Sequence, residues 1–338
     1  MINIVRDLCC LDGVSGREAE IREYIINRIK DKSEVTVDAL GNIIAFVKGK
    51  NRAQKKVMLD AHMDEVGLII TAVTADGFLK FSTVGGINTS VLLARRVIIN
   101  KSVYGVISMK PVHMVKGEEK TKIPEMDSLY IDIGANDRES ALELVKPGDF
   151  AVFEGGYESL GDLVISKALD DRIGCAAIID IIEKSAMYDF YATFTVQEEV
   201  GTRGAKTAAY TVNPDFAFVL ESTTASDIAG VADDKKVCLV GNGAVISFMD
   251  NGTLYDRELF DMALDLAKEK NIKCQIKSYV SGGNNAASIH QSRGGVRTLA
   301  ISVPCRYIHS ASSVASEEDM LSVRNLAEAM LNLVASGE

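Results

Sequence analysis

Histidine and acidic side chains follow most of the apolar runs in this sequence, close to the point where each run ends. The seven residues with this placement are His62, Asp64, Asp170, Glu198, Glu199, Glu221 and His309. In open α/β sheets, ligands bind beyond the carboxyl ends of the strands, so residues that follow strands can meet at one edge of a sheet. Two imidazoles with several carboxylates suit borderline divalent ions such as zinc, cobalt or manganese, without any need for thiolates.

The same set of residues is large enough for two metal ions. The two histidines and three carboxylates (Asp170, Glu199 and Glu221) suffice if one carboxylate bridges the ions. A pair of metal ions polarises a carbonyl group and activates a water near neutral pH, as in phosphatases, nucleases and aminopeptidases. Neighbouring side chains in a strand point to opposite faces, so Glu198 and Glu199 can take different roles, one as a ligand and one as a general base.

Each of these residues also has an ordinary structural interpretation when it is taken singly. A histidine at a strand end can be a buried core residue, and an acidic residue can cap a helix or lie in a surface turn. Seven residues at the same edge of one sheet are hard to explain in this way, which favours a metal site. The other two histidines, His113 and His290, do not follow the pattern, and we expect them to be structural or to lie behind the ligands.

The composition indicates a globular protein of the cytoplasm. The chain has 338 residues, 47% of them hydrophobic, and a net charge of −10. This charge argues against binding to the phosphates of nucleic acids. No apolar run approaches the roughly 20 residues of a membrane span, and the amino terminus lacks a basic segment followed by an apolar core. The six cysteines show no metal-type spacing, so we expect reduced thiols.

Helices and apolar strands alternate through most of the chain. Hydrophobic residues at helical spacing predict helices at residues 17–30, 171–186, 255–270, 286–291 and 317–335. Short apolar runs predict strands at residues 56–61, 192–196, 216–220, 237–240, 272–279 and 296–303. Ser15 and Glu18 have the form of a capping box before the first of these helices. The alternation predicts an α/β fold, a three-layer α/β/α sandwich around a mixed sheet.

Between residues 68 and 160 the pattern changes to short strands separated by turns, with one helix at residues 137–145. Strands of this length and spacing are typical of a small barrel or sandwich. We therefore predict a discontinuous catalytic domain, residues 1–67 and 161–338, and an inserted β-barrel domain, residues 68–160.

Four sequence motifs carry a resemblance to a known family. They are residues 60–67 (DAHMDEVG), 167–172 (KALDDR), 197–201 (QEEVG) and 303–310 (VPCRYIHS). In this order they resemble the glutamyl aminopeptidase and tetrahedral (TET) aminopeptidase family of co-catalytic dinuclear metallopeptidases, of which some members carry an endoglucanase label. The resemblance extends over essentially the whole chain, and it includes the inserted β-domain.

The resemblance implies a role for each candidate residue. The implied metal ligands are His62, Asp170, Glu199, Glu221 and His309. Asp170 resembles the bridging carboxylate, which in the family is followed by a cis peptide bond, here to Asp171. Asp64 resembles the acid that orients the imidazole of His62. Glu198 resembles the general base that takes a proton from the activated water and passes it to the leaving amine.

Two positions depart from the family pattern. Glu221 stands where many relatives have Asp, so we expect the ion at this position to shift or to bind with altered affinity. Residues 283–286 read GNNA where relatives often read GTDA. The contact that the missing acid makes, either behind the ligands or to the substrate amine, is therefore in question at Asn285.

The family implies a metalloaminopeptidase that removes N-terminal amino acids from short peptides, with two divalent ions per subunit, zinc or cobalt. It also implies a cytoplasmic homo-oligomer, typically a tetrahedral dodecamer, assembled through the inserted domain that also controls substrate access. Relatives differ in whether they prefer acidic, neutral or basic N-terminal residues. The sequence leaves this preference open, together with the native metal.

Two other classes of function are compatible with parts of the pattern. A glycoside hydrolase of the endoglucanase type needs two carboxyl groups about 5–10 Å apart across a sugar, which the adjacent Glu198 and Glu199 fit poorly. The chain also has no tryptophan for stacking on sugars. A non-catalytic assembly protein on the same fold is expected to lose Glu198 or a ligand, and all of them are present.

Overall fold

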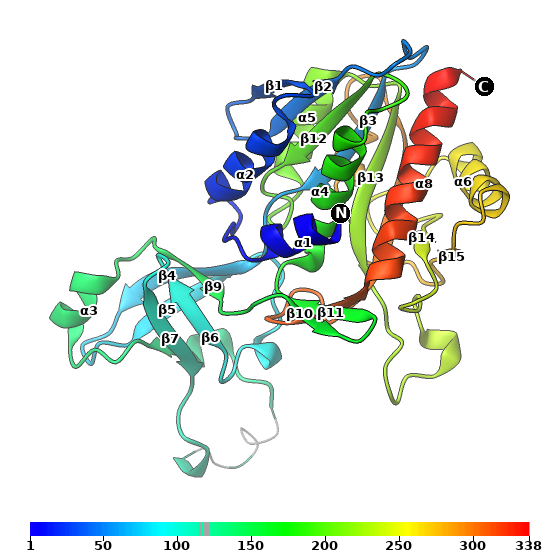
Figure 1. The fold of residues 1–338 in the computed structure, drawn as a ribbon. Helices are drawn as coiled ribbons and strands as arrows, with labels where there is room; N and C mark the ends of the chain where they lie inside the picture. The colour runs from blue at the N-terminus through cyan, green and yellow to red at the C-terminus, as the bar shows by residue number, and fades with distance from the viewer. Residues whose placement is uncertain (115–116, 118–121, 338) are drawn as a thin grey trace.

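The protein consists of a large α/β body and a smaller β-barrel that projects from it (Figure 1). The computed structural model describes residues 1–114, 117 and 122–337. Among these residues, no helix is both long enough and apolar enough to cross a membrane.

A mixed sheet of 11 strands forms the middle layer of the α/β body. Its strands are β1 (Glu34–Val37), β2 (Ile43–Val47), β3 (Val57–His62), β10 (Glu158–Leu160), β11 (Leu163–Ser166), β12 (Phe190–Thr195), β13 (Phe216–Thr224), β14 (Ala244–Ile246), β15 (Cys274–Ile276), β16 (Arg297–Arg306) and β17 (Ser313–Ser316). The main path is β1-β2-β12-β3-β13-β16-β17-β11-β10, and β14 joins β15 to β16. The four central strands β12, β3, β13 and β16 are parallel, so their carboxyl ends lie at one edge.

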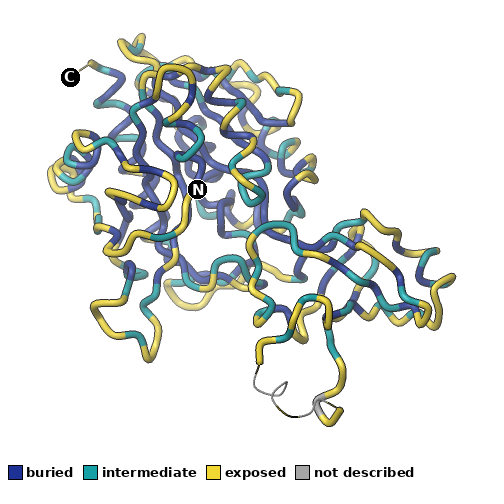
Figure 2. The backbone as a smooth tube through the Cα atoms, turned by 180° about the vertical axis from the view of Figure 1, so that it is seen from behind, coloured by how far each residue is buried: buried dark blue, intermediate teal, exposed yellow. Residues whose placement is uncertain are grey.

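Helices cover both faces of the sheet, which confirms the predicted three-layer sandwich (Figure 1). The helices on one face are α1 (Ile2–Cys9), α2 (Ala19–Ile29), α4 (Leu169–Glu183) and α8 (Glu317–Ser336), with α6 (Arg257–Glu269) beside α8. The helices on the other face are α5 (Arg203–Val212) and α7 (Ala286–Ile289). Helix α4 packs on β3 and β13 and is buried along almost its whole length. Figure 2 shows the general pattern, with buried segments inside the body and exposed ones around it.

The local sequence explains where the longest helix begins and ends. The hydroxyl of Ser316 accepts the main-chain N–H of Glu318, and three acidic residues occupy the first turn of α8. Such a cap and such charges stabilise the amino end of a helix. At the other end Gly337 adopts a left-handed conformation with φ of 84°, which glycine tolerates and which ends the helix.

The inserted segment forms a closed antiparallel barrel with its own hydrophobic core. Its strands are β4 (Gly67–Val73), β5 (Leu79–Val84), β6 (Arg96–Ile99), β7 (Val103–Ser108), β8 (Tyr130–Asp132) and β9 (Phe150–Phe153), closed in the order β4-β5-β8-β7-β6-β9. Helix α3 (Arg138–Leu144) lies beside it, capped by Asp137 and Ser140. The predicted barrel is confirmed, and the domain boundaries at residues 67/68 and 160/161 stay predictions.

Some predicted elements differ from the observed ones. Residues 237–240 were predicted as a strand, but they form no strand because side chains take their main-chain donors. The N–H of Leu239 bonds to Gln275 and that of Val240 to Asp227. The predicted strand at residues 272–279 shortens to β15, the one at residues 216–220 extends to Thr224, and the helix at residues 286–291 ends at Ile289.

Candidate active site

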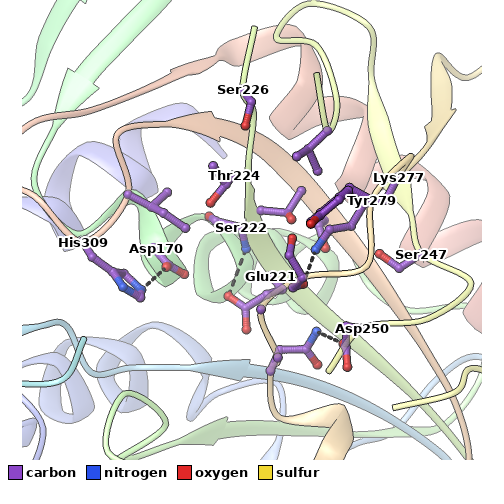
Figure 3. A pocket seen from close by; sticks show the side chains of 18 of the residues that line it. Asp170, Glu221, Ser222, Thr224, Ser226, Ser247, Asp250, Lys277, Tyr279 and His309 are labelled. Carbon is purple, nitrogen blue, oxygen red and sulfur yellow. Dashed lines mark hydrogen bonds and ion pairs between the residues drawn. The ribbon is translucent and has the colours of Figure 1, made fainter. Parts of the chain in front are cut away.

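The residues predicted from the sequence gather at the carboxyl edge of the parallel strands. They are His62 at the end of β3, Asp170 in the first turn of α4, Glu198 and Glu199 in the loop after β12, Glu221 inside β13 and His309 in the loop after β16. Figure 3 labels Asp170, Glu221 and His309 among them. Glu221 lies within its strand rather than beyond it, because β13 runs on to Thr224.

The imidazole of His62 turns its Nε2 atom toward two carboxylates. Its Nδ1 lies 3.0 Å from the main-chain oxygen of Asp64, and its Nε2 lies 3.4 Å from Asp170 Oδ1 and 3.5 Å from Glu221 Oε1. A carbonyl oxygen only accepts, so Nδ1 carries the hydrogen and Nε2 of the neutral ring presents a lone pair. Burial lowers the pKa of His62, but the charge of Glu221 outweighs this effect and holds the pKa well above its ordinary value.

His309 repeats this arrangement on the other side of Asp170. Its Nδ1 lies 3.0 Å from the carbonyl oxygen of Gly86, and its Nε2 lies 3.2 Å from Asp170 Oδ2 and 3.4 Å from Glu199 Oε2. Asp170 therefore turns one oxygen toward each imidazole. This is the geometry expected of a carboxylate that bridges two cations, each of which also contacts one histidine.

The donor atoms fit divalent cations. Asp170 Oδ1 and Asp171 Oδ2 are buried and have no hydrogen-bond partner in the described part of the chain. Buried carboxylate oxygens without donors are costly unless a cation compensates them. Possible ligand atoms of His62, Asp171 and Glu221 lie within 4.8 Å of one another, as do those of His62, Asp170 and Glu199. Imidazole nitrogen combined with carboxylate oxygen suits borderline ions such as zinc, cobalt and manganese.

Glu198 and Glu199 lie in the loop beyond strand β12, so the prediction that strand alternation turns them to opposite faces is wrong. Strand β12 ends at Thr195, and Gln197 has a φ of 56°, outside any strand conformation. Glu199 still turns toward His309, whereas Glu198 lines a cavity beside the site. Burial raises the pKa of each carboxyl to about 8, although the charge of the nearby histidines opposes this.

Asp64 connects His62 to the loop that carries the two glutamates. Its Oδ1 lies 3.4 Å from His62 Nδ1 and accepts the N–H of Glu198 at 3.0 Å, and its Oδ2 accepts the N–H of Glu199 at 3.1 Å. The hydroxyl of Ser15 donates to Oδ2 at 2.6 Å. Burial raises the pKa of Asp64, but the contact with His62 outweighs this effect and holds the pKa below its ordinary value. The carboxylate therefore stays ionised.

The predicted capping box is therefore wrong, because Ser15 bonds to Asp64 instead of capping α2. The helix begins at Ala19 without a side-chain cap. The carboxylate of Glu18 accepts the N–H groups of Gly16 and Gln197. Both residues support the loop of Glu198, and nothing in the local sequence distinguishes this use from a helix cap.

Comparison with known proteins identifies the family. The model of the M42 glutamyl aminopeptidases matches residues 41–326. The chain belongs to this family. It is 41% identical to a putative aminopeptidase of Acetivibrio thermocellus over 95% of each chain.

Solved structures of similar proteins agree with the family assignment. An aminopeptidase of the archaeon Desulfurococcus kamchatkensis matches with a TM-score of 0.94 at 33% identity, over 99% of this chain and 95% of that one. The TET1 peptidase of Pyrococcus horikoshii, which assembles into a tetrahedron or a large octahedral shell, matches with a TM-score of 0.85 at 36% identity, over 97% of this chain and 98% of that one. This M42 protein is a metal-dependent aminopeptidase, an enzyme that hydrolyses peptide bonds.

A cavity of about 580 Å³ opens beside the candidate ligands of this M42 enzyme (Figure 3). The residues of the predicted site that line it are His62, Asp170, Glu198, Glu221 and His309. Other polar residues that line it are Ser222, Thr224, Ser247 and Lys277. The cavity therefore provides space for a substrate group next to the cluster of carboxylates and imidazoles.

Asn285, where the sequence departs from the family pattern, lies beneath the site and does not line the cavity. It is fully buried, and its amide donates to Asp60 Oδ2 at 2.7 Å and to the hydroxyl of Thr195 at 2.8 Å. The neighbouring Asn284 lines the cavity. The change at Asn285 therefore acts on the support of β3 and β12 and does not contact a bound substrate.

Sequence reasoning missed Asp171 as a possible ligand and treated it only as the neighbour of Asp170. The peptide bond between these two residues is cis, as the resemblance implied. Asp171 Oδ1 accepts the N–H of Gly174 at 2.9 Å, and burial together with the charge of Glu221 raises the pKa of Asp171 well above its ordinary value.

The other histidines, His113 and His290, lie outside the candidate site. His290 Nδ1 faces the Ala286 carbonyl, and His113 lies in a short 3-10 turn.

Proposed function

We propose that this enzyme removes N-terminal residues from short peptides at two divalent metal ions. The proposed ligands are His62 and Glu221 for one ion, His309 and Glu199 for the other, and Asp170 as the bridge. The observation that carries the proposal is that Asp170 turns one oxygen to each imidazole, while both imidazoles use their Nδ1 atoms elsewhere. Bound metal ions supply Lewis-acid polarisation of the scissile carbonyl and lower the pKa of water.

Glu198 is the proposed general base. Its carboxyl lines the cavity beside His62 and Glu221, where it can reach a water next to a bound substrate. A base with a pKa near neutral pH can accept this proton and then donate it to the leaving amine. Cations held by the neighbouring carboxylates would lower this pKa from about 8 and so keep Glu198 ready to accept the proton.

Asp64 is the proposed orienting residue. It sets the ring of His62 through Nδ1 and fixes the loop of Glu198 and Glu199 through their main-chain N–H groups. Contacts of this kind fix the tautomer of a ligating histidine and raise its basicity. A single carboxylate thus holds one ligand and the base in a fixed relation.

Zinc and cobalt are the metals we propose, because the ligands combine imidazole with carboxylate and include no thiolate. The likeness to the TET1 peptidase supports a homo-oligomer, and we propose a tetrahedral dodecamer in the cytoplasm, assembled through the barrel of residues 68–160. Sedimentation equilibrium tests this assembly: a mass near 36.5 kDa, that of the single chain, would contradict it.

Release of N-terminal residues from a panel of aminoacyl-p-nitroanilides and short peptides tests the function. We expect turnover by the metal-loaded protein, loss of turnover in EDTA and recovery when zinc or cobalt is added back. N-acetylated versions of the same peptides are matched controls, because only a free α-amine should be accepted. Hydrolysis of a β-glucan that persists in EDTA, without release of amino acids, would instead support a glycoside hydrolase.

A further inference from the structure

A buried carboxylate outside the proposed ligand set holds the two basic residues on either side of Asp170. Glu65 is 3% exposed and directly follows Asp64 in the chain. Its carboxylate accepts hydrogen bonds from Lys167 Nζ, at 2.9 Å to each oxygen, and from Arg172 at 3.1 Å. Lys167 comes three positions before Asp170 and Arg172 two positions after it. One side chain therefore holds the chain on both sides of the proposed bridging residue.

Main-chain groups and a second acid fix this cluster of Glu65, Lys167 and Arg172 in turn. Lys167 Nζ lies 3.3 Å from Asp12 Oδ1, so two acids balance the two bases. The main-chain partners lie in α1 and the loop after it, and they are the carbonyl oxygens of Leu8 and Leu11 and the N–H of Gly13. Breaking a buried ion pair leaves an uncompensated charge, so both bases depend on Glu65 for their position.

The first turn of α4 is irregular, so regular helical geometry does not set the position of Asp170. Asp170 has a ψ of 108° and Asp171 has a φ of −119°, both outside the helical range. Ala168 has a φ of 55°, which is uncommon for a residue other than glycine, and no side chain of the described residues caps this helix. The turn that carries Asp170 therefore needs support from outside the helix.

Glu65 provides such a support from the loop that carries His62. His62 ends β3, and Glu65 follows it by three positions in the same loop. A cavity of about 10 Å³ is lined by both groups of residues, namely Glu65 and Lys167 of the cluster and Asp170, Glu199 and His309 of the candidate site. A space of this size holds no more than about one water, so the cluster packs closely beside the site.

We propose that Glu65 is a positioning residue that sets Asp170 against His62 by holding Lys167 and Arg172. This inference rests on the proposed function, because it concerns the bridge between the two proposed ions. Asp170 turns one oxygen to each imidazole, so a shift of its main chain disturbs both ions at once. Loss of the Glu65 carboxylate should therefore weaken both ions, whereas a change on the His309 side alone should weaken one.

Cobalt(II) titration against a chelator of known affinity, followed by the visible absorption of the bound metal, tests the inference. Glu65→Gln keeps the size of the side chain and removes its charge. We expect the affinity for both ions to fall by about 10- to 100-fold, as when a support behind metal ligands is lost. The cobalt spectrum should change as well, because Asp170 is displaced. A merely structural role for Glu65 would lower the stability of the fold and leave the affinities and the spectrum of the folded variant unchanged.

Asp180→Asn is the matched control, because it removes a similarly buried carboxylate from the same helix. Asp180 is 5% exposed and lies near the other end of α4. It also holds several cations, namely Lys184, Arg324 and the amino terminus of the chain. This substitution should leave both affinities and the cobalt spectrum unchanged. Equal weakening by Asp180→Asn and Glu65→Gln would show a general effect on α4 and would overturn the inference.

Lys167→Met tests whether Glu65 acts through this lysine. On its own it should weaken both ions, so it keeps the inference testable if Glu65→Gln fails to fold. In the Lys167→Met background, Glu65→Gln should cost less affinity than it does in the wild type, since the two residues share one interaction. The same cost in both backgrounds would contradict the inference.

Two further outcomes separate this inference from the proposed function. A Glu65→Gln protein that binds two cobalt ions as tightly as the wild type, with the same spectrum, would overturn the inference while the proposed function stands. Wild-type protein that does not bind two cobalt ions would overturn both.

Discussion

The ring of His309 is held by the main-chain carbonyl of Gly86, 223 positions earlier in the sequence, through a contact of 3.0 Å to Nδ1. Gly86 lies in the segment that leaves β5 of the barrel, whereas His309 follows β16 of the large sheet. The His309 side chain is 34% exposed, compared with 2% for His62. The more exposed imidazole of the candidate site therefore depends on the barrel for its orientation.

Substituting Gly85 by Ala should disturb this side of the metal site. Gly85 has a φ of 87°, and an added Cβ would lie 2.8 Å from Val66 Cγ1 and 3.2 Å from Glu199 Cβ. We expect Gly85→Ala to weaken binding at the proposed ion of His309 and Glu199 by about tenfold or more, as when a support of a ligand is disturbed. Metal titration against a chelator of known affinity measures this change directly.

Gly134→Ala separates this effect from backbone strain. Gly134 lies after β8, has a similar φ of 77°, and nothing lies within 4 Å of its added Cβ. Both substitutions place a non-glycine residue in the left-handed region, which costs about 1–2 kcal/mol of stability. Only Gly85→Ala should change the metal titration. Equal weakening by both variants would show that the contact with Glu199 is unimportant.

The adjacent pair Glu198 and Glu199 provides a test of separate roles. Glu198→Gln should retain two metal ions and lose about 10²–10⁴-fold in kcat, because a general base is removed and the ligands remain. Glu199→Gln should lose activity together with metal, since Glu199 Oε2 is the oxygen that faces His309 Nε2. Metal content by elemental analysis, measured beside kcat on the same samples, distinguishes the two. Equal metal loss in both variants would contradict the assignment.

Removing the charge of Asp64 should affect the metal and the base together. Asp64→Asn keeps the size of the side chain but weakens the acceptors for the N–H groups of Glu198 and Glu199 and the support of His62. We expect metal affinity to fall by about 10- to 100-fold. Ser15→Ala removes only one donor to Asp64, so its effect should be smaller in the same chelator competition. An Asp64→Asn enzyme with wild-type affinity would refute the orienting role.

How much of this site could be predicted from the sequence depends on how local each contact is. His62 and His309 follow buried strands, and parallel strands bring their carboxyl ends to one edge, so a local pattern suffices to place them together. Ser15 and Gly86 reach the site only through tertiary packing, and no spacing in the sequence indicates their partners. Lys277 likewise follows a short strand whose neighbour, β14, is far away in the chain.

The fold shows the same distinction between features set by local sequence and features set by tertiary packing. Helices and central strands were predicted because their apolar spacing is a local property, whereas residues 237–240 have the composition of a strand but form no ladder in the described residues. Their donors go to Asp227 and Gln275 instead. Glu198 and Glu199 were assigned different roles by strand alternation, and they do turn to different partners, but the cause is the turn at Gln197 and the hold of Asp64.

Asp256 joins the start of helix α6 to strand β16, and its ionisation affects stability at low pH. Asp256 caps helix α6 by accepting the N–H of Leu259 at 3.0 Å. The same carboxylate accepts two hydrogen bonds from Arg297 at the start of β16, at 2.6 and 2.8 Å. The hydrogen bonds of this guanidinium hold the pKa of Asp256 below its usual value.

A depressed pKa means that the folded state binds fewer protons than the unfolded state at this carboxyl. Its contribution to stability is therefore complete above the unfolded pKa of about 3.9 and is lost as the pH falls through the lower folded value. Asp256→Asn keeps a capping side chain but cannot ionise, so the difference in unfolding free energy between wild type and variant should stay constant from pH 6 to about pH 5 and shrink from there down to about pH 3. Asp256→Ala should lose a further ~1 kcal/mol at every pH, because the cap is removed too. Urea unfolding of the three proteins across this range tests the prediction, and a wild-type minus Asn difference that stays constant with pH would contradict it.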